Sequence, residues 1–277
     1  MARYLRSPGI TALQVVLALA ALVYAGALGF LYFDQERLIF RGLALSGDHR
    51  FHFEEPFQEI RVPVDGASLD ALYFPQSDPR GLVFFLHGNA GNLETWTTGV
   101  DFYRRVNYDL FIFDYRGYGK STGRIESERQ LHDDVRAAWD AIAPRYAGKP
   151  IVIYGRSLGT ALAAHLARDV HPALLVLVSP YTSLTAVGRR LYPWAPEWLV
   201  RYPLRTDADI DAITNPILLL HGRDDTLIPA EESIKLRALA RGRADLVLID
   251  GAGHADIHRF PGYIDTLAAR LTALGAR

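Results

Sequence analysis

The sequence predicts a doubly wound α/β domain with a mostly parallel sheet of about eight strands, preceded by one N-terminal transmembrane helix. Three observations lead to this expectation. From Gln58 onwards short β-rich segments alternate with helical segments, several of the β-rich segments are apolar throughout, and the start of the chain holds a long uncharged apolar run. Alternating strands and helices are typical of a parallel sheet that helices cover on both faces.

The composition is that of an ordinary globular protein. Of the 277 residues, 49% are hydrophobic and 22% are charged, and the formal net charge is −1. No basic field would recruit nucleic acid, so we expect no nucleic-acid partner, and no obligate protein partner is evident. The chain has no cysteine, which excludes disulfides, thiolate nucleophiles and cysteine-based zinc sites. Because it also lacks an HExxH motif and clustered ligands, we expect no metal and no organic cofactor.

The apolar run is long enough to cross a membrane. After a tail at residues 1–9, residues 10–33 comprise 24 residues without a charge. As a helix with a rise of ~1.5 Å per residue this run would measure about 36 Å, against a hydrocarbon core of about 30 Å. It lacks the polar stripe of a helix packed on a globular core. We therefore interpret residues 10–33 as an uncleaved single-pass anchor.

Two properties of this anchor stay open. The small residues at 25–27 resemble a signal-peptide cleavage site, although the apolar run continues beyond them. Arg3 and Arg6 precede the run while Arg37 and Arg41 follow it, so the basic residues are nearly balanced across it. A short basic tail that stays in the cytoplasm would place the rest of the chain on the extracytoplasmic, periplasmic side, and this is our expectation.

The remainder divides into a connector at residues 34–57, without firm periodicity, and one domain at residues 58–277. Eight segments are typical of strands: EIRVPV, LDALYF, LVFFLH, DLFIFDY, IVIYG, LLVLVSP, ILLLHG and LVLID. The first two alternate more and indicate an antiparallel edge, whereas the continuously apolar ones indicate strands buried on both faces. Within Glu126–Ala143 apolar residues recur at helical spacing, which predicts a helix.

A serine follows the fifth of these strands in a sharp turn. The motif GRSLG at residues 155–159 comes directly after an apolar strand and opens a helical segment. Such a turn strains the serine backbone and holds the hydroxyl above the sheet, near the positive end of the helix, while Gly155 and Gly159 permit close strand–helix approach. The pattern alone also occurs by chance in structural turns. Its position between strand and helix makes Ser157 the candidate nucleophile.

A serine hydroxyl needs a base, and the base needs a carboxylate to orient it and stabilise its charged form. Of nine histidines, His254 is the best candidate, because it follows the last strand in a GAGH loop that can reach Ser157. His258 begins a helix and is weaker. After the strand ILLLHG, Asp225 has the expected spacing, and Asp224 stays an alternative.

The negative charge of a tetrahedral intermediate needs backbone N–H donors. We expect one from Leu158, directly after the serine. The other is expected from Asn89 in the loop HGNAGN at residues 87–92, for which a simple tight turn is the alternative.

The segment at about residues 181–206 predicts a short helical lid. It carries five aromatic residues: Tyr181, Tyr192, Trp194, Trp198 and Tyr202. These side chains are candidates to line an acyl pocket or to rest at a bilayer interface. Ordinary packing of a cap on the core would explain them equally well.

Together the motifs resemble those of a known family. HGNAGN, FDYRGYGKSTG (113–123), GRSLG, HGRDDTLIP (221–229) and GAGH are similar to those of the membrane-anchored, serine-peptidase-like group of α/β-hydrolase-domain proteins, which includes lipid hydrolases and protein depalmitoylases. QERLIFR (35–41) looks like the juxtamembrane segment of this group. The resemblance implies the α/β-hydrolase fold, whose catalytic residues follow the chain order Ser157, Asp225, His254.

We therefore expect a serine hydrolase that cleaves a carboxylic ester or thioester of a small or lipid-like acyl substrate through an acyl-enzyme. A serine at the turn, where dehalogenases and epoxide hydrolases use aspartate, argues against those activities. Two alternatives remain. The same triad cleaves amides, so the chain could be a serine peptidase or aminopeptidase acting on short peptides, and it could also be a catalytically silent, membrane-anchored binding module on a hydrolase scaffold.

Overall fold

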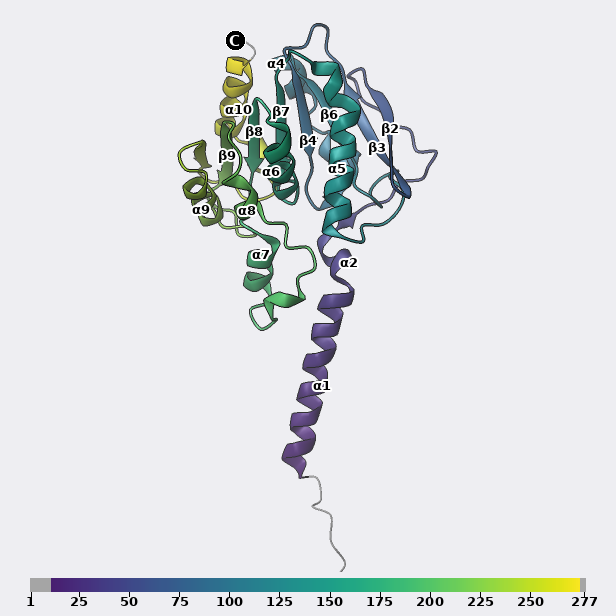
Figure 1. The fold of residues 1–277 in the computed structure, drawn as a ribbon, viewed down its shortest axis with the longest axis vertical. Coiled ribbons are helices and arrows are strands. Elements are labelled where there is room, and N and C mark those ends of the chain that lie inside the picture. Colours follow the sequence, from purple (N-terminus) through teal and green to yellow (C-terminus); the bar gives the residue numbers. More distant parts are fainter. Residues whose placement is uncertain (1–10, 275–277) are drawn as a thin grey trace, which may run out of the picture.

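A long helix leads into the α/β domain in the computed structural model, which describes residues 11–274 (Figure 1). Residues 1–10 and 275–277 lie outside the described residues. These include the tail at residues 1–9, with Arg3 and Arg6, and Ile10, the first position of the expected anchor. Helix α1 (Ala12–Phe33) begins at Thr11, which exchanges hydrogen bonds with Gln14. No residue of α1 is buried in the protein, and its length and apolar composition suffice to cross a membrane.

Eight strands form the central sheet, in the order β10-β9-β8-β7-β4-β6-β3-β2. Their bounds are β2 (Gln58–Val64), β3 (Ala67–Phe74), β4 (Leu82–Leu86), β6 (Asp109–Phe113), β7 (Ile151–Arg156), β8 (Leu174–Val178), β9 (Ile217–Gly222) and β10 (Ala244–Ile249). Strand β3 pairs antiparallel with β2 and β6, and the other neighbours are parallel. The predicted mostly parallel sheet and its antiparallel edge are confirmed.

Helices cover both faces of this sheet, which is why β4, β6, β8 and β9 are buried at every residue. One face carries α5 (Glu128–Ile142), α6 (Gly159–Val170), α8 (Thr206–Ile210) and α9 (Glu231–Leu239). The other carries α3 (Leu93–Trp96), α4 (Asp101–Val106) and α10 (Pro261–Leu274). Short 3-10 turns are η1 (Ala143–Tyr146) and η3 (Ile257–Arg259).

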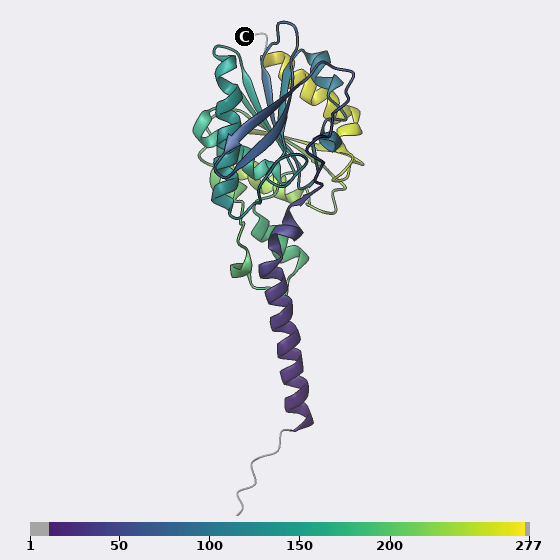
Figure 2. The same ribbon diagram turned by 90° about the vertical axis from the view of Figure 1, so that its right-hand side faces the viewer.

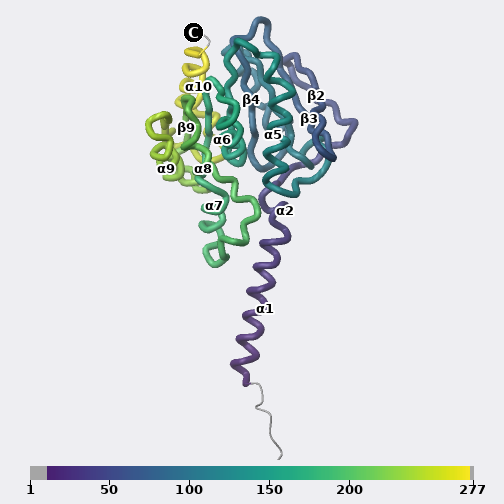
Figure 3. The backbone as a smooth tube through the Cα atoms, viewed as in Figure 1, coloured from purple at the N-terminus to yellow at the C-terminus, as the bar shows by residue number. Residues whose placement is uncertain are grey.

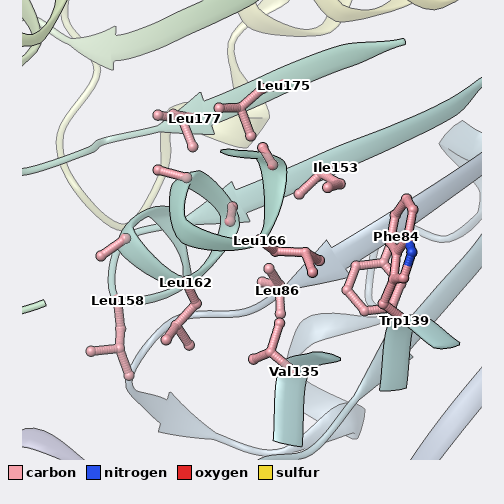
Figure 4. Packing of buried hydrophobic residues seen from close by; sticks show 14 of the residues in the cluster. Phe84, Leu86, Val135, Trp139, Ile153, Leu158, Leu162, Leu166, Leu175 and Leu177 are labelled. Carbon is pink, nitrogen blue, oxygen red and sulfur yellow. The ribbon is translucent and has the colours of Figure 1, made fainter. Parts of the chain in front are cut away.

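The core on the α5–α6 face is close-packed. Figure 4 shows Val135 of α5 and Leu162 and Leu166 of α6 directed into one cluster with strand residues, and Trp139 meets Phe84 edge to face. Each fully buried leucine contributes about 1.5–3 kcal/mol relative to an exposed one. This packing gives the carboxyl ends of the strands a rigid base.

The connector after α1 holds two short elements that carry no periodic signal in the sequence. They are α2 (Gln35–Ile39) and the two-residue strand β1 (Arg41–Gly42). Strand β1 pairs in parallel with β5 (Ala90–Gly91), in the loop after β4. The connector is therefore joined directly to the loop that carries Asn89.

The chain leaves the sheet after β8 to form the predicted helical lid. It consists of α7 (Leu184–Leu191), a turn, and the 3-10 turn η2 (Glu197–Leu199). Figures 1 and 2, related by a quarter turn, both show the lid beside the domain-proximal part of α1. The backbone path in Figure 3 brings α2 and α7 to the same end of the domain. This end is the one to which the carboxyl ends of the parallel strands point.

Candidate active site

Ser157 stands at the sharp turn between β7 and α6. Its φ is +52°, in the left-handed region that costs a residue with a side chain ~1–2 kcal/mol. Neighbouring elements hold this conformation, because its N–H donates to the Val178 carbonyl at 2.9 Å and its carbonyl accepts from the Thr160 N–H at 2.9 Å. The flanking glycines are sterically required: a Cβ at Gly155 would lie 2.5 Å from the carbonyl oxygen of Gly159.

His254 lies between Ser157 and Asp225. Its Nε2 is 2.9 Å from Ser157 Oγ, and its Nδ1 is 2.7 Å from Asp225 Oδ2. The three side chains come from the carboxyl ends of β7, β9 and β10. With Nδ1–H donating to the carboxylate, the lone pair of Nε2 faces the serine hydroxyl and can accept its proton.

Asp225 is buried, with only 5% of the residue exposed. Its carboxylate accepts several hydrogen bonds. Oδ1 accepts from the N–H groups of Leu227 at 3.0 Å and Ile228 at 2.8 Å. Burial alone would raise the pKa of Asp225, but hydrogen bonds from His221, His254 and the Ile228 N–H outweigh burial and hold this pKa well below its usual value. The carboxylate is therefore charged at neutral pH and stabilises a positive charge on His254.

The two weaker candidates lie elsewhere. The side chain of Asp224 is exposed to solvent. His258 places its Nδ1 3.4 Å from a guanidinium nitrogen of Arg156. Burial and the positive charges of Arg156 and Arg259 lower the pKa of His258. The structure thus brings His254 and Asp225, and not these neighbours, to the serine.

Arg156 is a positioning residue that the motif did not reveal. It donates to the carbonyl oxygens of His254 at 3.3 Å and Ala255 at 3.0 Å, and its guanidinium lies 5.3 Å from the ring centre of Trp96. It therefore orders the loop that carries the histidine.

Two backbone N–H groups beside Ser157 are free to bind an anion. Neither the N–H of Leu158 nor that of Asn89 has a hydrogen-bond acceptor within residues 11–274, and both residues line one cavity with Ser157. The loop of Asn89 comes close, since a Cβ at Gly88 would lie 3.5 Å from Ser157 Cβ. Unpaired N–H groups next to a nucleophile are what an oxyanion requires.

The cavity that these groups share measures about 230 Å³ and is mainly apolar. Its walls are the end of α1 with α2, the lid, and the strand ends. Tyr181 and Tyr192 of the predicted lid aromatics line it. Trp194 packs instead on Tyr24 of α1, with ring centres 6.1 Å apart, and Trp198 is 74% exposed.

The cavity residues contributed by the N-terminal helices are the ones that the sequence did not reveal: Leu31, Gln35, Leu38 and Ile39. An apolar run predicts a span but not what its end will contact. The one signal was a glutamine, Gln35, placed two residues after the end of the run. In residues 11–274 we find no group of three or more histidine, aspartate or glutamate side chains arranged to hold a metal ion.

Comparison with known proteins decides the family. The family model described as "Serine aminopeptidase, S33" matches residues 77–203. Human alpha/beta hydrolase domain-containing protein 17B is 33% identical over 207 residues, which are 71% of this chain and 69% of that protein. The chain belongs to the α/β-hydrolase family. This α/β hydrolase is also 35% identical to the uncharacterized protein Rv2307c of Mycobacterium tuberculosis over 259 residues, 90% of each chain.

Solved structures confirm the α/β-hydrolase fold. The Pyrococcus furiosus esterase Pf2001 superposes with a TM-score of 0.70 at 19% identity, over 85% of this chain and 98% of that one. An alpha-beta hydrolase from Vibrio vulnificus has a TM-score of 0.64 at 25% identity, over 77% and 80% of the two chains. The order Ser157, Asp225, His254 along the chain is the order typical of this fold.

Proposed function

We propose that this α/β hydrolase is a membrane-anchored serine hydrolase that cleaves carboxylic esters or thioesters of lipid-like acyl chains through an acyl-enzyme. The observation that carries the proposal is the hydrogen-bonded series Ser157–His254–Asp225, placed at an apolar cavity. An apolar pocket with a few convergent polar groups suits a substrate with an alkyl chain and one reactive carbonyl.

In the proposed reaction Ser157 Oγ attacks the carbonyl carbon while His254 Nε2 takes the hydroxyl proton. The carbonyl oxygen becomes negatively charged and accepts hydrogen bonds from the N–H groups of Leu158 and Asn89. His254 then gives the proton to the leaving alkoxide or thiolate, and the acyl group stays on Ser157. Water attacks this ester with His254 as base, and the carboxylic acid leaves as the proton returns to Ser157.

The cavity walls favour an acyl substrate over a peptide. An aminopeptidase must hold the ammonium group of its substrate, and a buried charge needs a partner of opposite sign. Among the residues that line the cavity, the one carboxylate is that of Glu197, and it is already paired with Arg189 at 3.1 Å. Peptide cleavage remains the second candidate because the same triad acts on amides and the matching family model is described as an aminopeptidase.

Helix α1 supports the membrane part of the proposal. Its 22 residues amount to ~33 Å at ~1.5 Å per residue, enough for a hydrocarbon core of about 30 Å. A signal sequence would satisfy the same criterion. Retention is favoured because Tyr24, which precedes the cleavage-like residues 25–27, donates its hydroxyl to the Trp194 carbonyl of the lid at 3.0 Å.

This contact also sets the depth of the lid in the proposed membrane. Tyr24 lies nine residues before Phe33, which is ~13 Å along the helix. One leaflet of the hydrocarbon core is about 15 Å deep. The lid tip would therefore sit within that leaflet, where its exposed Leu191, Trp194 and Trp198 would contact lipid. We propose that the acyl chain reaches Ser157 from the bilayer, between α1 and the lid.

The arginines of α7 are compatible with this depth because their charges are partnered. Arg189 pairs with Glu197, and Arg190 donates to the carbonyl oxygens of Thr226 and Leu227. Long arginine side chains can also direct their guanidinium groups towards the headgroups while their stems stay in the apolar layer.

We further propose that the domain lies on the extracytoplasmic side, as the short basic tail indicates. Protease added to intact spheroplasts should then degrade the domain, whereas complete protection would place it in the cytoplasm.

The first test is labelling of the full-length protein with a fluorophosphonate probe, which reacts with activated serines. Wild type should be labelled and Ser157→Ala should not. Ser127→Ala is the matched control, since Ser127 caps α5 at the surface and should leave labelling unchanged. Hydrolysis of p-nitrophenyl acyl esters in preference to aminoacyl anilides would support esterase chemistry. A folded wild type that resists the probe would favour the silent binding module.

A further inference from the structure

We propose that the juxtamembrane segment, residues 35–42, positions the oxyanion hole by fixing the peptide that presents the Asn89 N–H. This inference rests on the proposed acyl transfer at Ser157. It goes beyond that reaction because it gives the connector between anchor and domain a part in catalysis.

Asn89 is held through its carbonyl oxygen and its side-chain amide nitrogen. Its carbonyl oxygen accepts from the Arg41 N–H at 2.7 Å and from the Tyr118 hydroxyl at 2.8 Å. Its side-chain Nδ2 donates to the Ile39 carbonyl at 3.1 Å. Two of these three partners belong to the juxtamembrane segment. The N–H of Asn89 has no acceptor within residues 11–274, and Asn89 lines the cavity together with Ser157.

The residues after Asn89 continue this attachment. Ala90 and Gly91 form β5, whose one partner strand in the described part of the chain is β1 at Arg41 and Gly42. The eight-stranded sheet does not include this loop. The juxtamembrane segment therefore replaces the sheet as the support of the oxyanion loop.

Tyr118 closes the arrangement from the other side. Its ring lies against Gly42, where an added Cβ would come within 2.5 Å of the ring Cγ, and its hydroxyl reaches Asn89. The side chain is buried and does not line the cavity. Within residues 11–274 the Tyr118 hydroxyl bonds to the Asn89 carbonyl alone, so removing it should act through the peptide that it holds.

The segment is also fixed at its other end. The buried side chain of Gln35 accepts from the Arg201 N–H at 2.7 Å and donates to the Leu199 carbonyl at 3.0 Å. Glu36 accepts from the Tyr202 hydroxyl at 2.8 Å. Residues 199–202 belong to the segment in which the chain returns from the lid, so one short segment joins α1, the lid and the oxyanion loop.

This arrangement predicts an effect on the transition state more than on substrate binding. A donor contributes to rate when it meets the developing charge at the correct place, and a small displacement weakens that contact. The acyl chain, in contrast, would be bound by the apolar cavity walls, while the Asn89 carbonyl already accepts hydrogen bonds from Arg41 and Tyr118. Loosening the Asn89 peptide through Tyr118, which does not line the cavity, should therefore lower kcat and leave KM nearly unchanged.

The test compares Tyr118→Phe with Tyr108→Phe in the full-length protein, using a short water-soluble ester. Tyr108 is a matched control, because its buried hydroxyl donates to the Leu271 carbonyl at 2.9 Å on the opposite face of the sheet. Both variants should lose similar thermal stability. Only Tyr118→Phe should lose kcat, by about tenfold, with KM within about twofold.

The affinity for an alkyl trifluoromethyl ketone is a second measurement, and a purely structural role of Tyr118 would leave it unchanged. Ser157 Oγ adds to the carbonyl carbon of the ketone, and the serine proton passes to His254. The former carbonyl oxygen then carries a negative charge. Its affinity should fall in parallel with kcat in Tyr118→Phe and also in Asn89→Leu, which keeps the backbone N–H but loses the bond to Ile39. Because both substitutions act on one peptide, the fold loss of kcat in the double variant should be smaller than the product of the two single fold losses.

Equal kcat and equal ketone affinity in Tyr118→Phe and Tyr108→Phe would overturn the proposed positioning role while leaving acyl transfer in place. An inert, unlabelled wild type would instead overturn the acyl transfer itself, and with it this inference.

Discussion

The inner and outer ends of the cavity are formed by different parts of the fold. At the inner end Ser157, His254 and Asp225 stand on the carboxyl ends of three strands of one buried sheet, joined by hydrogen bonds of 2.7 and 2.9 Å. At the outer end, Leu31 of α1 and Tyr192 of the lid line the mainly apolar cavity, on elements outside the sheet. The comparison shows that the candidate catalytic residues stand on the buried sheet, whereas the outer walls of the cavity come from α1 and the lid.

The largest effect should come from the inner end, in Asp225→Asn. An asparagine can turn its amide to donate to His254 Nδ1, which leaves the proton on Nε2 and removes the base that faces Ser157. We expect kcat to fall about 10⁴-fold, measured with a soluble ester at neutral pH. Asp224→Asn is the control, because it changes an exposed carboxylate one residue away and should have little effect. Comparable losses in both variants would contradict the inner-end assignment.

A substitution at the outer end should instead change the selectivity for acyl chain length. Val187 of α7 lines the cavity, so Val187→Trp should fill space that an acyl chain needs. We expect hydrolysis of long-chain esters to fall about 10- to 100-fold, equivalent to about 1.4–2.7 kcal/mol, while acetyl ester hydrolysis changes little. The acetyl ester in the same protein serves as the control. A uniform loss across chain lengths would mean that Val187 supports the triad and not the substrate.

The inner end should also be visible in stability as a function of pH. The folded-state pKa of Asp225 is lowered, so its contribution to the free energy of unfolding is present above the unfolded pKa of about 3.9 and is lost as the pH falls towards the folded pKa. Urea unfolding of wild type and Asp225→Asn at pH 7 and pH 3 should give a stability difference that narrows by about 1 kcal/mol at pH 3. A difference that does not change with pH would contradict the lowered pKa.

The inner end was also the more predictable from sequence. Each candidate catalytic residue lies at or in the loop after a largely apolar strand, and Ser157 follows β7 directly, so the local pattern indicated all three candidates. The choice between Asp225 and Asp224 was harder, because adjacent residues share chemistry. It depends on the turn that points the Asp225 carboxylate at the N–H groups of Leu227 and Ile228.

The outer end depends on contacts that no local pattern encodes. Strands β1 and β5 have two residues each, too few to show a period, and they join Arg41 to Ala90 across much of the sequence. The sequence left three explanations open for Trp194 and Trp198: pocket lining, contact with a bilayer, or ordinary packing of a cap on the core. The fold places both outside the main cavity, because the turn after α7 directs them towards α1 and solvent.

The smallest effect we expect is spectroscopic, and it tests whether the outer end lies in the bilayer. The chain has four tryptophans, of which Trp194 and Trp198 are on the lid tip and are 47% and 74% exposed. In vesicles of brominated phosphatidylcholine, the bromine atoms should quench the fluorescence of these two tryptophans. Quenching should be strongest with bromine placed partway along the acyl chains, because the tip is expected ~13 Å into the leaflet.

Variants separate the lid signal from that of the domain. Replacing Trp194 and Trp198 by phenylalanine should abolish most of the quenching. Replacing Trp139 should not, since that residue is buried in the core beside Phe84. The substitutions at the lid should leave hydrolysis of a short soluble ester unchanged, because neither tryptophan lines the cavity. Quenching that is absent, or that survives the double replacement, would place the lid outside the membrane and require the acyl chain to enter from water.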